Sequence, residues 1–129
     1  MTKTGVSQAK VQVASVAAAT SDLYSDSLAA LTSLRKTMLS AAWQTELDKA
    51  TPEDRLASSR LLIQVQQAIL NLTNQSLSDI AAQMQANGKE LAKCTADLTQ
   101  ALQNIQKMQA IIETAGSLIT TVGKFVAMV

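Results

Sequence analysis

The fold class is decided by residues 91–129, which read LAKCTADLTQALQNIQKMQAIIETAGSLITTVGKFVAMV. In this stretch every seventh residue from Leu91 to Val126 is apolar, and so is the residue three places after each of them, from Cys94 to Val129. Two apolar positions in every seven residues, sustained over about four heptads or more, are typical of an α-helix that packs as in a coiled coil. The stretch therefore predicts an all-α fold of long amphipathic helices.

The first of these two series continues towards the N-terminus in steps of seven. Its further members are Met84, Leu77, Leu70, Ile63 and Leu56. We call the whole series, from Leu56 to Val126, the heptad stripe, and its apolar character predicts that it is buried throughout. Before Leu91 the companion positions are mixed, and a second apolar stripe is present, as in a helix that touches two neighbours. This second stripe consists of Leu62, Val65, Ile69 and Leu72.

A helix boundary is predicted at Thr51-Pro52. Thr51 is a suitable N-cap and Pro52 suits the first helical position, where a missing N–H has no helical partner to lose. Asp54 follows Thr51 by three residues, as in a capping box. Upstream of this boundary, apolar residues at three- and four-residue steps predict one long helix over about 7–50, continuous or mildly bent over residues 17–27.

Asn87-Gly88 is a second candidate boundary, because Gly after Asn is a common helix stop. A turn here would give three antiparallel helices, about 7–50, 52–86 and 89–128, in one domain over residues 1–129, a three-helix bundle or coiled-coil-like rod. The alternative is the first helix followed by one continuous helix over 52–129 in an oligomer, since a helical Gly costs only about 1 kcal/mol. We favour the turn, which lets the chain bury its own stripes, and expect a further weak point between Asn71 and Ser78.

The composition limits the function. Hydrophobic residues make up 47% and aromatic residues only 2%, with 4 Gly and 1 Pro, which favours helices over sheets. A net charge of +1 gives no electrostatic reason to expect a nucleic-acid partner. The chain has no His and one cysteine, Cys94, which we predict to be a buried thiol. We therefore expect no enzyme activity, no metal or cofactor, and no small-molecule substrate.

The C-terminal segment, residues 111–129, is the most unusual part of the sequence. After Glu113 its only charged residue is Lys124, and small residues recur on one helical face at Gly116, Thr120, Gly123 and Ala127. Small faces let helices approach closely. The segment predicts an interaction or membrane-contacting face, whose residues are Ile112, Gly116, Ile119, Val122, Gly123 and Val126.

These observations favour a non-enzymatic structural or interaction protein that associates through apolar heptad faces with itself or with another helical protein. The alternative is a membrane-active protein that uses residues 111–129. In its Ala-, Gln-, Ser- and Thr-rich helices and apolar end, the outline resembles bacterial α-helical pore-forming toxins and secretion-system translocators, which implies a segment that inserts. We predict neither a cleavable signal peptide nor a clear transmembrane span, so the expected location is cytoplasmic or leaderless secreted.

Overall fold

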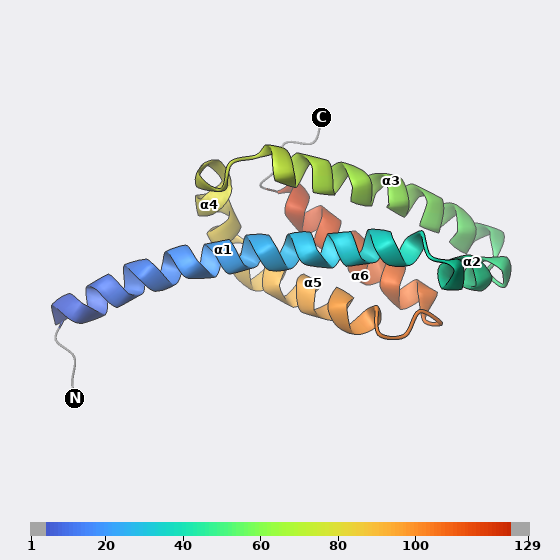
Figure 1. Ribbon diagram of the computed structural model, residues 1–129, viewed down its shortest axis with the longest axis horizontal. Coiled ribbons are helices and arrows are strands. Elements are labelled where there is room, and N and C mark those ends of the chain that lie inside the picture. Colours follow the sequence, from blue (N-terminus) through green and yellow to red (C-terminus); the bar gives the residue numbers. More distant parts are fainter. Residues whose placement is uncertain (1–4, 125–129) are drawn as a thin grey trace.

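The computed structural model describes the backbone of residues 5–124 and the side chains of residues 21–124. This part of the chain is all-α, which confirms the predicted class. Its helices are α1 (Gly5–Met38), α2 (Ala41–Asp48), α3 (Pro52–Asn74), α4 (Leu77–Ala86), α5 (Gly88–Ala101) and α6 (Met108–Gly123) (Figure 1).

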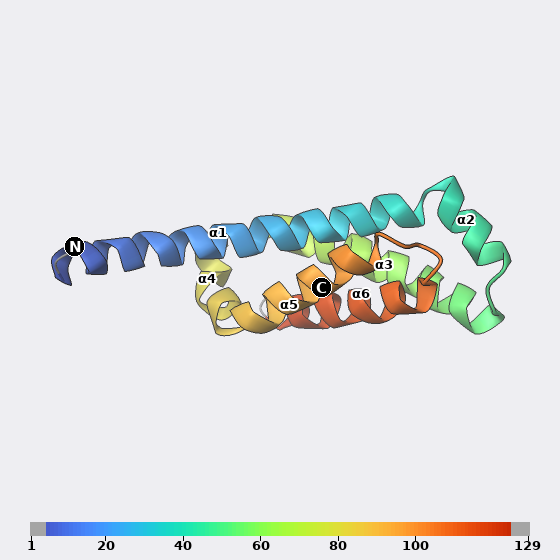
Figure 2. The ribbon, with the colours of Figure 1, turned by 90° about the horizontal axis from the view of Figure 1, so that it is seen from below.

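Four of these helices, α1, α3, α5 and α6, run lengthwise around a common core. Both α1 and α6 pack against α3 and α5, and Figure 1 shows α1 and α5 running one way while α3 and α6 run the other. The short helices α2 and α4 lie at opposite ends of the bundle, and the N-terminal part of α1 extends past the other helices (Figure 2). The observed arrangement thus has four long helices where the sequence predicted three.

The predicted helix over 7–50 is wrong at one point, because it breaks at Leu39-Ser40 and continues as α2. Ser40 is the N-cap of α2, and its Oγ accepts a hydrogen bond from the Trp43 N–H at 3.2 Å while donating to the Thr37 carbonyl at 2.6 Å. Serine side chains offer the backbone this alternative to a continuous helix. The bend brings Trp43 into the core, where its Nε1 donates to Ser58 Oγ at 3.0 Å. Over residues 17–27 α1 is continuous, as expected.

The predicted helix over 52–86 begins as expected and then divides. Thr51 caps α3 by accepting from the Asp54 N–H at 3.1 Å, and Pro52 is the first helical residue. The expected weak point is a full break, where Ser76 caps α4 by accepting from the Asp79 N–H. Between α4 and α5 only Asn87 intervenes, and Gly88 does not adopt a positive φ.

The predicted helix over 89–128 also divides. α5 ends at Ala101, and α6 starts at Met108 after a reversal of the chain. In the connection Asn104 Oδ1 accepts from the Gln106 N–H at 3.1 Å, a side-chain turn that competes with helix. The reversal lets α6 lie back along α5 in an antiparallel pair. The breaks after Asn74, at Asn87 and after Ala101 also rule out the alternative of one continuous helix within the described residues.

The heptad stripe is therefore buried only in part. Its members Met84, Leu91, Leu98 and Ile119 lie in the core, while Leu77, Ile105 and Ile112 are half-buried against it. In α3 the prediction is wrong, because Leu56, Ile63 and Leu70 point to solvent. The last member, Val126, lies outside the described residues.

Candidate interaction surface

Helix α3 uses a different apolar stripe for the core than its heptad positions. Its buried apolar residues are Leu61, Val65, Ala68 and Leu72. At about 100° per residue, these residues are centred roughly 160° around the helix from Ile63. The heptad positions of α3 thus lie on the side opposite the core.

These heptad positions form an apolar surface that nothing in the described chain covers. Leu56 is 52% exposed, Ile63 63% and Leu70 57%. Seven residues correspond to about 10.5 Å along a helix, so the three side chains follow one line about 21 Å long. We call these three residues the α3 stripe. Single exposed apolar residues are ordinary on protein surfaces, but a regular row at heptad spacing is the pattern of a helix-pairing seam.

The surroundings of the α3 stripe are polar but nearly uncharged. The charged residues of α3, which are Glu53, Asp54, Arg55 and Arg60, all lie in its first nine residues, and from Leu61 to Asn74 the helix has none. The side chains flanking Ile63 on the same face, one turn away in each direction, are Ser59, Arg60, Gln66 and Gln67, all exposed. A helix placed here would meet few charges to desolvate.

The predicted C-terminal face is mostly inside the bundle. Val122 is fully buried, Ile119 is only 8% exposed, and Ile112 is half-buried against the core. Among the residues that the structure describes, Gly116 and Gly123 do not serve a close helix approach, because a Cβ added at either would meet none of their atoms within 4 Å. Val126 lies outside the described residues. In this fold a membrane-inserted α6 would have to leave its contacts with α3 and α5.

Membrane contact by the C-terminal segment stays a prediction. Among the helices of residues 5–124, none has the length and apolar character that crossing a bilayer requires.

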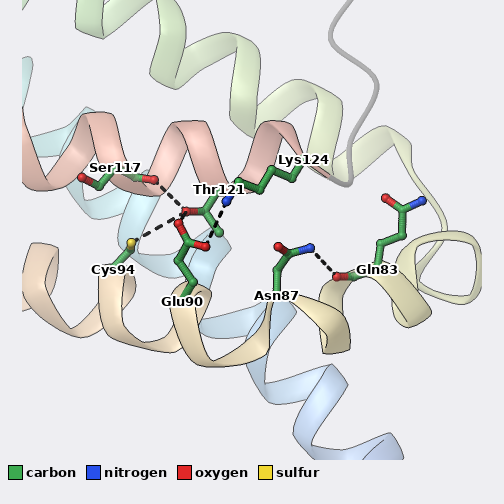
Figure 3. A network of polar contacts seen from close by, with 7 residues as sticks. All are labelled: Gln83, Asn87, Glu90, Cys94, Ser117, Thr121 and Lys124. Carbon is green, nitrogen blue, oxygen red and sulfur yellow. Dashed lines mark hydrogen bonds and ion pairs between the residues drawn. The ribbon is translucent and has the colours of Figure 1, made fainter.

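A polar network joins α5 to the end of α6 (Figure 3). Lys124 Nζ lies 2.9 Å from Glu90 Oε2, and the Thr121 hydroxyl lies 3.3 Å from Glu90 Oε1 and 2.9 Å from the Ser117 carbonyl. The hydrogen bond from Lys124, and next its charge, lower the pKa of the Glu90 carboxyl, an effect that outweighs partial desolvation. Cys94 is buried as predicted, with its Sγ 3.8 Å from Thr121 Oγ1. The network fixes α6 against α5.

A groove of about 900 Å³ lies between α1 and α5. Its lining is mainly small residues, including Ala29, Ser33, Ala92 and Ala96, and it has one carboxylate, Asp26. Thr95 also lines it, but its buried Oγ1 has no hydrogen-bond partner within the described structure and no contact with solvent. The rest of the lining mixes alanine and leucine with polar side chains, among them Thr99, Gln100 and Gln103.

Metal-ligand chemistry is not evident in the described residues, where no three acidic or cysteine side chains converge. The carboxylates Asp22 and Asp26 are both exposed on α1. Lys93 and Asp97 form an ordinary ion pair one turn apart on α5, at 3.0 Å, and Asp97 raises the pKa of the Lys93 ammonium by hydrogen bonding and by its charge.

Comparison with known proteins gives no relative from which a role could be inferred. No protein-family model, curated protein or solved structure matches the chain. The function must therefore be argued from the surface itself.

Sequence reasoning included the residues of the α3 stripe but assigned them to the core. The missed signal was the mixed character of the companion positions: Ser59, Gln66 and Thr73 follow Leu56, Ile63 and Leu70 by three residues. All three are exposed. A seam that is half polar, beside a second stripe that is fully apolar, is the weaker candidate for the core.

Proposed function

We propose that this chain is a non-enzymatic helical interaction protein that binds a partner helix through the outer face of α3. The observation that carries the proposal is the α3 stripe, three large apolar side chains more than half exposed at heptad spacing. A partner helix with its own apolar seam would remove these side chains from water at roughly 25 cal/mol per Å² of apolar area.

The rest of the α3 face suits association without enzymatic chemistry. Ile63 is flanked by one serine, two glutamines and Arg60, so the face can hydrogen bond across a helix pair and has a single charge there to desolvate. The core of the bundle is formed by other residues, so binding at the stripe would not require the bundle to open. The partner class is a helical protein, either this chain itself or another.

The test is a titration followed by methyl NMR of Leu and Ile side chains. The ligand is an uncharged synthetic amphipathic helix with Leu at heptad positions and Gln and Ser elsewhere. We expect the methyl signals of Leu56, Ile63 and Leu70 to shift saturably, while those of the core leucine Leu61 move little. The control is the variant with Leu56→Ser, Ile63→Ser and Leu70→Ser, which should keep its melting temperature but lose the response. Shifts that are confined to other faces, or that persist in the variant, would overturn the proposal.

A further inference from the structure

The α3 stripe has an internal symmetry that narrows its partner. Resting on the proposed function above, we propose that the stripe binds a second copy of this chain, in an antiparallel α3–α3 pair with Ile63 at the two-fold axis. Leu56 and Leu70 lie at equal distances on either side of Ile63. A two-fold axis through Ile63 therefore places Leu56 of each copy against Leu70 of the other, and each apolar side chain meets an apolar side chain.

The charges on α3 favour this orientation. All its charged residues lie before Leu61, so an antiparallel pair sets the charged half of each helix against the uncharged half of the other. Arg60 would then face Gln66 of the second copy, and Ser59 would face Gln67. A parallel pair would instead set Arg60 against Arg60, and like charges at such a position are destabilising. Antiparallel helix dipoles also favour the pair.

The position of α3 in the bundle leaves room for a second copy. The stripe faces away from the core, so the two bundles would lie on opposite sides of the α3–α3 contact, and α3 forms one long edge of the molecule in Figure 1. An interface of this kind, in which the same surface of both copies meets, is the commonest way that proteins form dimers. With three large apolar residues from each copy, the contact is at the small end of specific interfaces, and we expect a weak, concentration-dependent dimer.

The register is tested by disulfide trapping of full-length variants, each of which adds one cysteine to the buried Cys94, with the wild type as the background control. In the antiparallel pair Ile63→Cys cross-links to itself. Leu56→Cys alone does not, because its own counterpart would lie about 21 Å away along the helix. An equal mixture of Leu56→Cys and Leu70→Cys gives the mixed disulfide in at least about ten-fold excess over either self-linked product.

The affinity is tested by sedimentation equilibrium up to millimolar concentration. Ile63→Asp should raise the dimer dissociation constant about ten-fold or more, because two aspartates would meet at the axis. Ile63→Lys should do the same alone, and an equal mixture of the two variants should recover association. The matched control is Gln64→Asp, which adds the same charge on an exposed position roughly 100° around the helix and should change the constant less than about two-fold.

The outcomes separate this inference from the proposed function. Efficient self-linking of Leu56→Cys would overturn the antiparallel register. A chain that stays monomeric at millimolar concentration, or that associates equally well with Ile63→Asp, would overturn the second copy as the partner. In either of these two cases the peptide titration still decides the proposed function, since saturable shifts at the stripe would leave a different helical protein as the partner. The mixed disulfide between Leu56→Cys and Leu70→Cys, together with weaker dimerisation of Ile63→Asp, would support the antiparallel α3–α3 pair.

Discussion

Ile63 on α3 and Ile119 on α6 belong to the same seven-residue series, yet the first is 63% exposed and the second 8%. The difference follows from the residues that neighbour each isoleucine on its own helix. Around Ile119 the companion positions Ala115 and Val122 are apolar and buried, and Ile119 borders the fully buried face of α6, which also contains Ile111 and Leu118. In α3 the heptad companions are polar, and the helix instead buries Leu61, Val65, Ala68 and Leu72, while Leu62 and Ile69 of the second stripe are half-buried against the core. The heptad positions of α3 face outward.

A seven-residue repeat thus identifies the apolar faces of a helix but does not tell which of them is buried in the core. When a helix has two such faces, the one with apolar residues on both sides excludes water over a larger area. The other is left for solvent or for a partner, and this is the physical basis of the interaction proposed for α3.

The largest difference between the two helices should appear when the same substitution is made at Ile63 and at Ile119. Ile119→Asp places an unpaired charge in the core and should lower the free energy of unfolding by about 3–5 kcal/mol, enough to unfold a marginal domain. Ile63→Asp should lower it by less than about 1 kcal/mol. Circular dichroism melts and urea titrations of dilute protein measure both. Equal losses at the two positions would show that the outer face of α3 is covered within the monomer.

A milder form of the same comparison lies within α3. Leu61→Ala removes a buried side chain and should lower the free energy of unfolding by about 2–5 kcal/mol through lost burial and an unfilled cavity. Leu70 lies on the opposite side of α3 from Leu61. Leu70→Ala should change the free energy of unfolding by less than about 1 kcal/mol and should weaken association instead. Urea unfolding at low protein concentration gives the first effect and sedimentation gives the second. If Leu70→Ala proves the more damaging to the monomer, the orientation of α3 is reversed.

A third prediction concerns the buried side of α5, where the Thr95 hydroxyl oxygen is buried and has no hydrogen-bond partner among the described residues. Thr95→Val keeps the shape and removes the unsatisfied group, so we expect the free energy of unfolding to rise by roughly 1 kcal/mol. Thr99→Val is the control, because Thr99 is exposed and its hydroxyl donates to the Thr95 carbonyl at 2.8 Å. A thermal melt distinguishes them. Destabilisation by Thr95→Val would mean that the hydroxyl has a partner in solution.

The smallest expected effect concerns the attachment of α6 to α5 through Glu90. Lys124 lowers the pKa of this carboxyl below its ordinary value of 4.5 in the folded state. A depressed folded pKa adds stability above the unfolded pKa, and this contribution is lost as pH falls through the folded pKa. The advantage of wild type over Glu90→Gln should therefore be fully present at pH 7 and should shrink as the pH falls below about 4.5, so that it is smaller at pH 3 than at pH 7.

Urea midpoints at the two pH values and at low and high salt measure this advantage, which should also shrink with salt because the pair is exposed. Glu113→Gln, an exposed carboxylate on α6, is the matched control. An advantage of wild type that is the same at pH 3 and pH 7 would contradict the ion pair as its source.

Local signals in the sequence predicted the local structure well. The cap at Thr51 could be predicted because a cap depends on residues three places apart, and the weak point between Asn71 and Ser78 could be predicted from its polar residues. The breaks at Ser40 and Asn104 were missed, since each depends on one side chain that competes with the helix and no Gly or Pro marks it. The outward face of α3 was missed for a different reason. The polar companions Ser59, Gln66 and Thr73 weaken the heptad positions as core candidates, but which face of α3 is buried is settled only by where α1 and α6 pack.

The arrangement of α1, α3, α5 and α6 around one core also has a consequence for synthesis on the ribosome. α1 is made before α3 and α5, against which it packs, and α5 ends only at Ala101. At a synthesis rate of roughly 5–20 residues per second, α5 is completed about 4–14 s after the face of α1 that contains Leu31 and Leu34. α6, by contrast, finds α3 and α5 already made. The core of the bundle therefore closes only after α6 has been made.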